Sequence, residues 1–321
     1  MTPSVSVIIP LYNKAPHIQE TLESVFSQSV RPYEILVVDD GSTDGSGDIV
    51  ARIDHPGLIL IRQANQGVSV ARNAGVNQAR GDYVAFLDAD DLWKPNHIEE
   101  LVRLINDYPG AGLYSTMHLI RMQGVFYVPR SPFGSEFSGI VKDFCAAYAD
   151  GLSLVTSSTA CVRREALISI GGFPINVRHG EDVIAWIKLA HRFGVAHSSR
   201  ITAIYNRDAI NRAASLPDKS VPASLDFLAD LIRQEGTNEQ FRLGARLLFA
   251  QIAFYTSASK RESGEWEGLL SILKLAKKCG MWGLTFKIAV LVLIPSKLLG
   301  YARHFRHKGI LKDGRMENNA P

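Results

Sequence analysis

The fold is decided by the stretch ILVVDDGSTD, residues 35–44, in which four apolar side chains run directly into two aspartates, a glycine and a serine. Four apolar residues in succession predict a strand buried on both faces. In an open parallel sheet, ligands bind at the carboxyl ends of the strands. Asp39 and Asp40 are therefore expected where two carboxylates can accept hydrogen bonds from the base or ribose of a nucleoside.

A tight turn is the alternative explanation of the same stretch. Gly41 would adopt a positive φ, and Ser42 or Asp44 would cap the next helix. Turn chemistry accounts for the glycine and the serine, but it does not account for a doubled aspartate.

Further short apolar runs lie on either side of this stretch and alternate with segments of helical periodicity. Strands of this kind, separated by helices, are typical of a mostly parallel sheet covered on both faces. The pattern predicts an α/β fold from residue 1 to about residue 110. The other expected strands are 5–9, ended by Pro10, then 58–61 and 83–87.

The strand at 83–87 leads into a second acidic motif, LDADD at residues 87–91. In an extended segment Asp88 and Asp90 point to the same side, about 7 Å apart, and can share one ligand. Neighbouring carboxylates repel each other unless a cation neutralises them, and Mg²⁺ or Mn²⁺ binds one or two carboxylates together with phosphate oxygens. An acidic loop tip is the alternative.

Between the two acidic motifs lies NQGVSVARNAG, residues 65–75, which predicts a helix start rich in small residues. Arg72 would point toward the carboxyl edge of the sheet. Two roles suit its guanidinium, a structural ion pair with a nearby aspartate or a contact with a phosphate or base. The two roles are not exclusive, and spacing alone does not choose between them.

The sequence beyond residue 110 predicts strands at 113–117 and 125–128, a loop at 131–138 and a helix entered through Gly180, Glu181 and Asp182. Acidic residues in a first turn suit the positive end of the helix dipole. We expect the α/β domain to span residues 1–215 and a helical C-terminal region to span 216–321.

Composition excludes several classes of function. A net charge of +3 and the lack of a basic, aromatic-interleaved tract argue against nucleic-acid binding. Three widely spaced cysteines, Cys145, Cys161 and Cys279, form no CxxC pair and fit a reducing cytoplasm. The N-terminus has no basic lead before a short apolar run, so a signal peptide is not expected.

Residues 281–308 are apolar at first and then basic. The longest uncharged stretch, 288–296, is well short of the roughly 20 residues that span a bilayer. An interfacial helix with a basic flank on anionic lipid is the favoured interpretation, with a buried core helix and a spanning helix as alternatives. The expected location is the cytoplasmic face of the inner membrane, as a peripheral protein.

Five motifs together closely resemble the family 2 glycosyltransferases with the GT-A fold. The resemblance covers about residues 4–210 and rests on the order and spacing of the whole set: VIIPLYNK (7–14), VVDDGSTD (37–44), NQGVSVARN (65–73), LDADD (87–91) and GED (180–182).

The resemblance implies roles for individual residues. A uridine or related nucleoside would contact Pro10, Tyr12, Asp39 and Asp40, with Arg72 near the base and diphosphate. Asp88 would hold the ribose, with Ala89 beside it among the nucleotide-sugar contacts, and Asp90 would bind the Mn²⁺ or Mg²⁺ that bridges the two phosphates. Asp91 would support Asp90 or face the donor sugar.

The resemblance also implies an inverting transfer of a sugar, from a UDP-sugar first of all, to the hydroxyl of a saccharide or lipid-linked saccharide. Asp182 is the expected general base and Glu181 the alternative, although either carboxylate would also cap the helix. Surface polysaccharide assembly, such as that of lipopolysaccharide, is the family-level expectation.

Two other functions are considered. A sugar nucleotidyltransferase would carry a glycine-rich loop after the first strand, but no glycine occurs before Gly41. A catalytically silent donor-binding scaffold would be expected to lack one of the two acidic motifs, and both are present.

Overall fold

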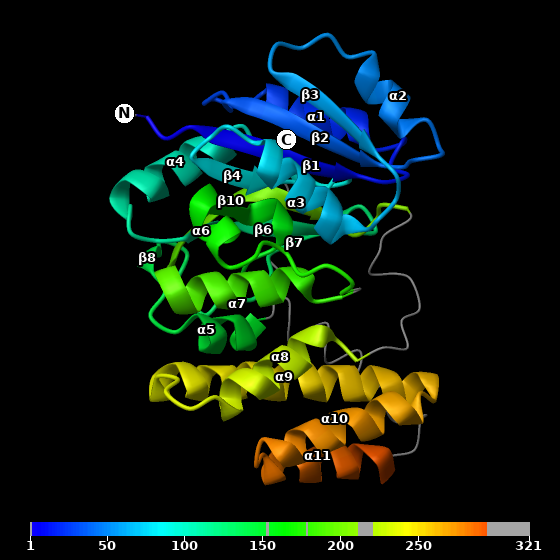
Figure 1. Ribbon diagram of the computed structural model, residues 1–321, viewed down its shortest axis with the longest axis vertical. Helices are drawn as coiled ribbons and strands as arrows, with labels where there is room; N and C mark the ends of the chain where they lie inside the picture. Colours follow the sequence, from blue (N-terminus) through cyan, green and yellow to red (C-terminus); the bar gives the residue numbers. More distant parts are fainter. Residues whose placement is uncertain (1, 152–153, 178, 211–220, 294–321) are drawn as a thin grey trace.

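The computed structural model describes residues 2–151, 154–177, 179–210 and 221–293. Figure 1 shows a sheet with helices on both sides in the upper part of the molecule and a stack of helices at the lower end. Within the described residues the sheet has ten strands, eight of them in the order β3-β2-β1-β4-β9-β6-β10-β5. The expected α/β architecture is confirmed.

The N-terminal half of the sheet is parallel. It consists of β1 (Val5–Leu11), β2 (Glu34–Asp40), β3 (Leu58–Gln63) and β4 (Tyr83–Phe86). All four strands were predicted, but β1 does not end at Pro10: the residue pairs with Val38, and the strand continues to Leu11.

The other half of the sheet is mixed. The strands β6 (Leu113–Met122) and β10 (Val195–Asn206) are parallel to each other, whereas β9 (Ala160–Arg163) is antiparallel to both β4 and β6. Three short strands add antiparallel pairs: β5 (Leu92–Trp93), β7 (Val125–Tyr127) and β8 (Ser138–Ile140). The expectation of a mostly parallel sheet thus describes the N-terminal half.

Side chains alternate between two hydrophobic clusters, one on each face of the sheet. Val7 and Ile9 face the cluster covered by α1 (Ile18–Phe26), α2 (Ser46–Ala51) and α4 (His97–Asp107). Ile8 faces the other cluster, covered by α3 (Val68–Gln78), α6 (Arg164–Ser169) and α7 (Glu181–Phe193). This double burial explains why the strands consist of continuous apolar runs.

The helical region shares the second cluster. It contains α8 (Ala223–Arg233), α9 (Glu239–Ser263), α10 (Trp266–Lys278) and α11 (Trp282–Leu293). Of these, α9 packs on α5 (Phe144–Gly151) and α8 packs on α7, and Trp186 belongs to the same buried cluster as Phe249 and Ile288. The expected boundary at residue 215 lies outside the described residues.

Candidate functional site

The carboxyl ends of three neighbouring strands bring the first motifs together. In the sheet β2, β1 and β4 lie side by side, and Leu11 at the end of β1 is in register with Asp39. Tyr12 follows directly, with 48% of its surface exposed. The phenol ring therefore stands at the edge where a nucleoside is expected, whereas Pro10 is partly covered within the strand.

The loops after β1 and β2 are linked through Asn13, which has a left-handed backbone with φ of 53°. Its backbone N–H donates to Ser42 Oγ at 3.0 Å, and its side-chain Oδ1 accepts from the Thr43 N–H at 2.8 Å. Asparagine tolerates this conformation better than most residues. The two loops are thus held together before any ligand arrives.

Both carboxylates of the first acidic motif are buried and hold the chain itself. Asp39 accepts a hydrogen bond from the Ser42 N–H at 3.0 Å. Asp40 accepts from the backbone N–H groups of Gln66 and Gly67 at 3.0 and 2.8 Å, and from the Gln63 amide at 2.7 Å. Turn chemistry thus accounts for Asp39, whereas Asp40 holds groups 23 to 27 residues further along the chain, so the turn alone does not explain both aspartates.

The second acidic motif is a turn and not an extended segment. The strand ends at Phe86, and the Asp91 N–H donates back to the Asp88 carbonyl at 3.0 Å. The predicted strand alternation of Asp88 and Asp90 is therefore wrong, because the turn sets their directions. Ala89 between them is buried, and its carbonyl accepts from Thr21 Oγ1 at 3.1 Å.

Asp91 is the buried anchor of this turn. Its Oδ1 accepts from the Asn206 N–H at 2.8 Å, and its Oδ2 accepts from Ser158 Oγ at 2.6 Å. Burial and then the charges of Asp88 and Asp90 raise its pKa well above the ordinary value, against the lowering effect of these two hydrogen bonds. Of the two roles considered, supporting the turn is the one these contacts favour.

Arg72 connects the acidic turn to the start of α7. Its guanidinium contacts Asp88 at 2.9 Å and Glu181 at 3.0 Å, and its side chain is only 4% exposed. Burial lowers the pKa of Arg72, but Asp88, Glu181 and Asp182 together raise it above its ordinary value. The structural ion pair, one of the two roles considered for Arg72, is therefore present in the described structure.

A clamp between α3 and the turn before α7 supports Arg72. The guanidinium lies over the ring of Phe173, 5.4 Å from its centroid. Asn73 accepts from the Phe173 N–H at 2.9 Å and donates to its carbonyl at 2.8 Å. A Cβ on Gly172, whose φ is +70°, would meet Asn73 Oδ1 at 2.6 Å. Glycine at this position is thus required by both conformation and space.

The two carboxylates at the start of α7 have different environments. Glu181 is neutralised by Arg72. Asp182 accepts a hydrogen bond from the Val183 N–H at 2.7 Å, and burial followed by the charge of Glu181 raises its pKa to about 7, against the lowering effect of Arg72. A carboxylate that titrates near neutrality can accept a proton at physiological pH.

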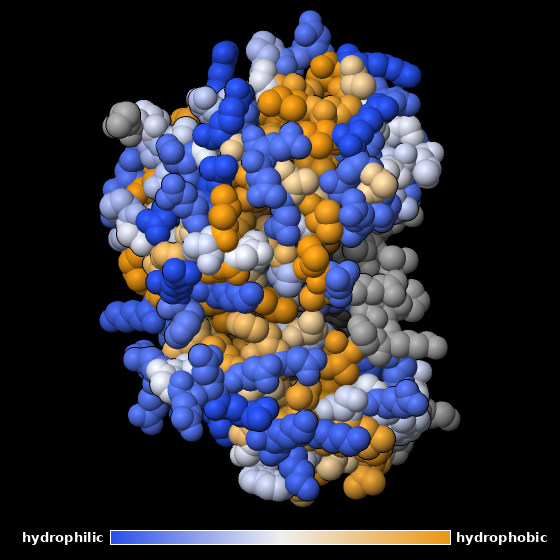
Figure 2. Space-filling view, viewed as in Figure 1, coloured by the Kyte–Doolittle hydropathy of each residue, from blue (hydrophilic) through white to orange (hydrophobic). Residues whose placement is uncertain are grey.

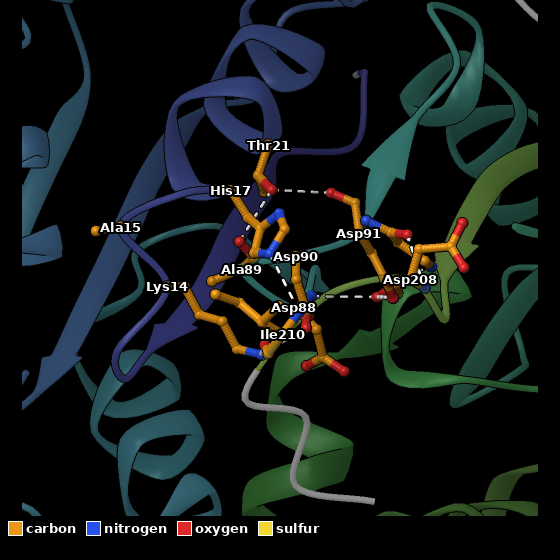
Figure 3. A network of polar contacts seen from close by, with 12 residues as sticks. Lys14, Ala15, His17, Thr21, Asp88, Ala89, Asp90, Asp91, Asp208 and Ile210 are labelled. Carbon is orange, nitrogen blue, oxygen red and sulfur yellow. Dashed lines mark hydrogen bonds and ion pairs between the residues drawn. The ribbon is translucent and has the colours of Figure 1, made fainter. Parts of the chain in front are cut away.

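Asp90, the expected metal ligand, contacts a cation of the chain. Lys14 Nζ lies 2.6 Å from Asp90 Oδ2 and also donates to the Ile210 carbonyl at 3.1 Å; Figure 3 shows this side chain reaching across from the loop after β1. No group of three His, Cys, Asp or Glu side chains that could hold a metal occurs in the part of the chain that the structure describes. Hard carboxylate oxygens at Asp88 and Asp90 fit a divalent ion that also binds phosphate.

Three contributors were missed or left without a role by the sequence analysis. Lys14 was noted only as part of a motif, Phe173 was not singled out, and Ser158 precedes β9 in a short 3₁₀ turn (Ser157–Thr159) without a motif. The partner of Ser158 lies 67 residues away in the sequence, and the partner of Lys14 lies 76 residues away. Of the three, only Lys14 could have been singled out from the sequence. It directly follows Tyr12 and Asn13 at a strand end that faces the acidic motifs.

The arrangement of the sheet and of the acidic turn after β4 defines a GT-A fold, and solved structures agree. The chain resembles TarS residues 1–349 from S. aureus in complex with UDP-GlcNAc, with a TM-score of 0.68 and 21% identity, over 95% of this chain and 89% of that one. It also resembles the mannosyltransferase PcManGT from Pyrobaculum calidifontis in complex with GDP-Man and Mn²⁺, with a TM-score of 0.56 and 21% identity, over 96% and 88% of the two chains.

Sequence comparison identifies the family. The family model described as glycosyl transferase family 2 matches residues 6–171, and the chain belongs to this family. A putative teichuronic acid biosynthesis glycosyltransferase of Bacillus subtilis, TuaG, is 33% identical over 192 residues, covering 58% of this chain and 72% of the relative. An uncharacterized glycosyltransferase of Rickettsia conorii is 32% identical over 189 residues, which is 59% of this chain but only 30% of the relative.

Proposed function

We propose that the chain transfers a sugar, with inversion at the anomeric carbon, from a nucleoside diphosphate sugar to an acceptor hydroxyl. A UDP-sugar is the first choice of donor. The support is the family membership, together with the similar GT-A structures of TarS in complex with UDP-GlcNAc and of PcManGT in complex with GDP-Man.

One observation carries the proposal. Arg72 bonds both to Asp88, in the acidic turn on the donor side, and to Glu181, in the carboxylate pair that resembles the family's base motif. The two motifs are 16 and 109 residues from Arg72 in the sequence, yet one buried guanidinium joins them. A donor-binding edge and a proton acceptor in one charged cluster are what a direct displacement requires.

In the proposed reaction Asp182 takes the proton of the acceptor hydroxyl. The hydroxyl oxygen forms the new bond to the anomeric carbon as the bond from that carbon to the diphosphate oxygen breaks, and the electron pair leaves with the nucleoside diphosphate. Asp182 is favoured over Glu181 because its pKa is raised toward neutrality, whereas the Glu181 carboxylate is held by the Arg72 guanidinium.

A divalent metal fits the carboxylates of Asp90 and Asp88. When bound, Mn²⁺ or Mg²⁺ would supply positive charge to the departing diphosphate. In this proposal Tyr12 presents an exposed ring to the base. Asp39 and Asp40, at the end of β2, hold the loops of the nucleoside site in place.

Calorimetric titration with UDP-, GDP- and dTDP-sugars, with and without Mn²⁺, tests this function. We expect one donor to bind in a metal-dependent way and the binding to be lost in Asp90→Ala. Circular dichroism of the variant must match the parent protein. If the folded parent binds none of the donors, both the transferase and the donor-binding scaffold are contradicted, whereas donor binding without any sugar transfer would favour the scaffold.

We further propose that the acceptor belongs to a cell-surface polysaccharide and is presented at a membrane. The similarity to the Bacillus relative, a putative teichuronic acid biosynthesis glycosyltransferase, supports the first part. None of the helices in the described ranges is long and apolar enough to cross a bilayer.

The surface of α11 supports membrane contact. Trp282, Phe286, Val290 and Leu293 recur at helical spacing and are exposed, three of them by 63% or more, while Ile288 and Leu291 face the core. The Lys277 ammonium lies over the Trp282 ring, 5.8 Å from its centroid. Figure 2 shows hydrophobic surface beside hydrophilic surface at the lower end of the molecule, where Figure 1 places α10 and α11. The basic end of the predicted segment, 294–308, lies outside the described residues.

Flotation with vesicles tests the membrane surface. The full chain should float with vesicles rich in anionic phosphatidylglycerol and not with pure phosphatidylcholine, because the apolar face and the lysines act together. Trp282→Ser with Phe286→Ser should reduce the bound fraction at least about threefold. Leu243→Ser, which alters an exposed leucine on α9, is the matched control and should leave it unchanged. Equal binding of all three forms would rule out this surface.

A further inference from the structure

The two cations that neutralise the acidic turn are held very differently. Arg72 is 4% exposed, bonds two carboxylates and lies over Phe173. Lys14 bonds the Asp90 carboxylate and the Ile210 carbonyl, and about a tenth of its side chain and of that of Asp90 is exposed (11% and 13%). A planar guanidinium that bonds two carboxylates with its rigid fork of N–H groups is fixed, whereas an ammonium on a flexible four-carbon stem can exchange one oxygen partner for another. Lys14 is therefore the cation that can exchange its bond to Asp90 for a bond to another partner.

Lys14 sits where three segments meet. It comes from the loop between β1 and α1, and it bonds both the turn after β4, through Asp90, and the segment after β10, through the carbonyl of Ile210. The same loop contacts that segment again, since the Ile210 N–H donates to His17 Nε2 at 3.4 Å. Figure 3 shows Lys14, His17, Asp90 and Ile210 gathered on one side of the acidic turn, with Asp91 on the other.

The ion pair has a consequence for metal binding at the same carboxylate. An ammonium 2.6 Å from Asp90 Oδ2 already neutralises that oxygen. A divalent ion that entered beside it would be repelled by the ammonium. It would also meet a carboxylate whose negative charge is already neutralised. A nucleoside diphosphate brings negative charge of its own, which offsets both effects.

We propose that Lys14 is a positioning residue that holds the place of the metal at Asp90 while the donor is absent, so that metal and donor bind together. The proposal rests on the metal-dependent donor binding of the proposed function. It assigns to Lys14 a change of partner, from the Asp90 carboxylate to the phosphates of the donor, when both ligands enter.

The test measures Mn²⁺ binding to the full chain by the electron paramagnetic resonance signal of unbound Mn²⁺, with and without UDP. Lys14→Met removes the charge and keeps an unbranched side chain that is one heavy atom shorter. Without UDP, this variant should bind Mn²⁺ at least about tenfold more tightly than the parent protein, because the repulsion between a unit charge and a dication a few ångströms apart is lost. With UDP present, the gain should disappear, since the phosphates then lose a cationic partner.

Two control variants sharpen the test. Lys14→Arg keeps the charge and should stay within about twofold of the parent protein in Mn²⁺ affinity without UDP. Lys142→Met removes the same charge from an exposed position before α5 and should change nothing. Unchanged or weaker Mn²⁺ binding by Lys14→Met without UDP overturns the proposal.

A measurement on the parent protein covers the case in which Lys14→Met does not fold. UDP should tighten Mn²⁺ binding, and Mn²⁺ should tighten UDP binding by the same factor of at least about ten. Independent binding of the two overturns the placeholder role and the metal dependence of donor binding, while sugar transfer without a metal would remain open to an activity assay. If Mn²⁺ binds neither the parent protein nor Lys14→Met even with UDP, the metal part of the proposed function fails together with it.

Discussion

Two acidic clusters lie on either side of Arg72, and similar residues behave differently in them. In the turn after β4, Asp88 and Asp90 each have a cation of the chain within 3 Å. At the start of α7, Glu181 is paired with Arg72, and the neighbouring Asp182 has a pKa raised to about 7. Partners, and not residue type, decide which carboxylates stay charged to hold a cation and which one can accept a proton.

The largest effect, on the rate of sugar transfer, is expected when the proton acceptor is removed. Asp182→Asn should reduce the transfer rate by roughly a hundred- to ten-thousand-fold, because no group then takes the acceptor proton. The dissociation constant of the donor should stay within about twofold. Single-turnover rates and calorimetry measure the two quantities, and Glu181→Gln is the comparison. An equal loss of donor binding in Asp182→Asn would refute its assignment as base.

The next largest effect is expected on the free energy of unfolding, when the Arg72 guanidinium that links the two clusters is removed. Arg72→Met leaves Glu181 buried, and Asp88 partly buried, without a cation, which should cost about 3 kcal/mol of unfolding free energy. Urea unfolding measures the change. The control is Arg130→Met, which removes a guanidinium from a half-exposed pair with Asp150 and should cost less than about 0.5 kcal/mol. Similar losses in both variants would contradict the structural role of Arg72.

The dependence of rate on pH tests the raised pKa of Asp182. The base must be ionised, so the rate should fall as the pH drops below about 7, by roughly eightfold between pH 7.5 and pH 6. Neighbouring charges bear on this value, since Glu181 and Asp88 raise the pKa and Arg72 lowers it. A single-turnover profile measured with saturating donor checks the prediction. A rate that stays flat down to pH 5 would mean that another group takes the proton.

The smallest effect is expected for Asp91→Asn, because the two oxygens of Asp91 accept hydrogen bonds from neutral donors, the Asn206 N–H and Ser158 Oγ. Burial and the charges of Asp88 and Asp90 raise the pKa of Asp91 and so disfavour its charged form, and Asp91→Asn should therefore cost less than about 1.5 kcal/mol. Asp91→Ala loses the hydrogen bonds from Asn206 and Ser158 and should cost about 3 kcal/mol. Urea unfolding of the pair separates the two cases, and equal losses would show that the charge of Asp91 matters.

The sequence predicts the strands of the N-terminal half well because their burial on both faces leaves continuous apolar runs. It also places the acidic motifs at strand ends, where the structure has them. The prediction fails where contacts between distant segments determine the conformation and the partners of a residue. The turn that closes with the Asp91 N–H on the Asp88 carbonyl replaces the expected alternation, and Asp40 is occupied by groups 23 to 27 residues further along the chain.

The roles of single cations were the least predictable part of the site. Nothing near Arg72 in the sequence distinguishes an ion pair with Glu181, 109 residues away, from a contact with phosphate. Likewise, the apolar pattern of α11 does not indicate which side chains face α9 and α10 and which face solvent. That division appears only once the helices are packed.

The core shared by the sheet and the lower helices has a thermodynamic consequence. Phe249 of α9 and Ile288 of α11 belong to the same buried cluster as Trp186 of α7, whose first residues carry the acidic pair. A fragment ending after β10 would expose one side of that cluster to water. Melting should therefore occur as a single calorimetric transition, with the C-terminal helices and the carboxylates of α7 lost in the same cooperative event.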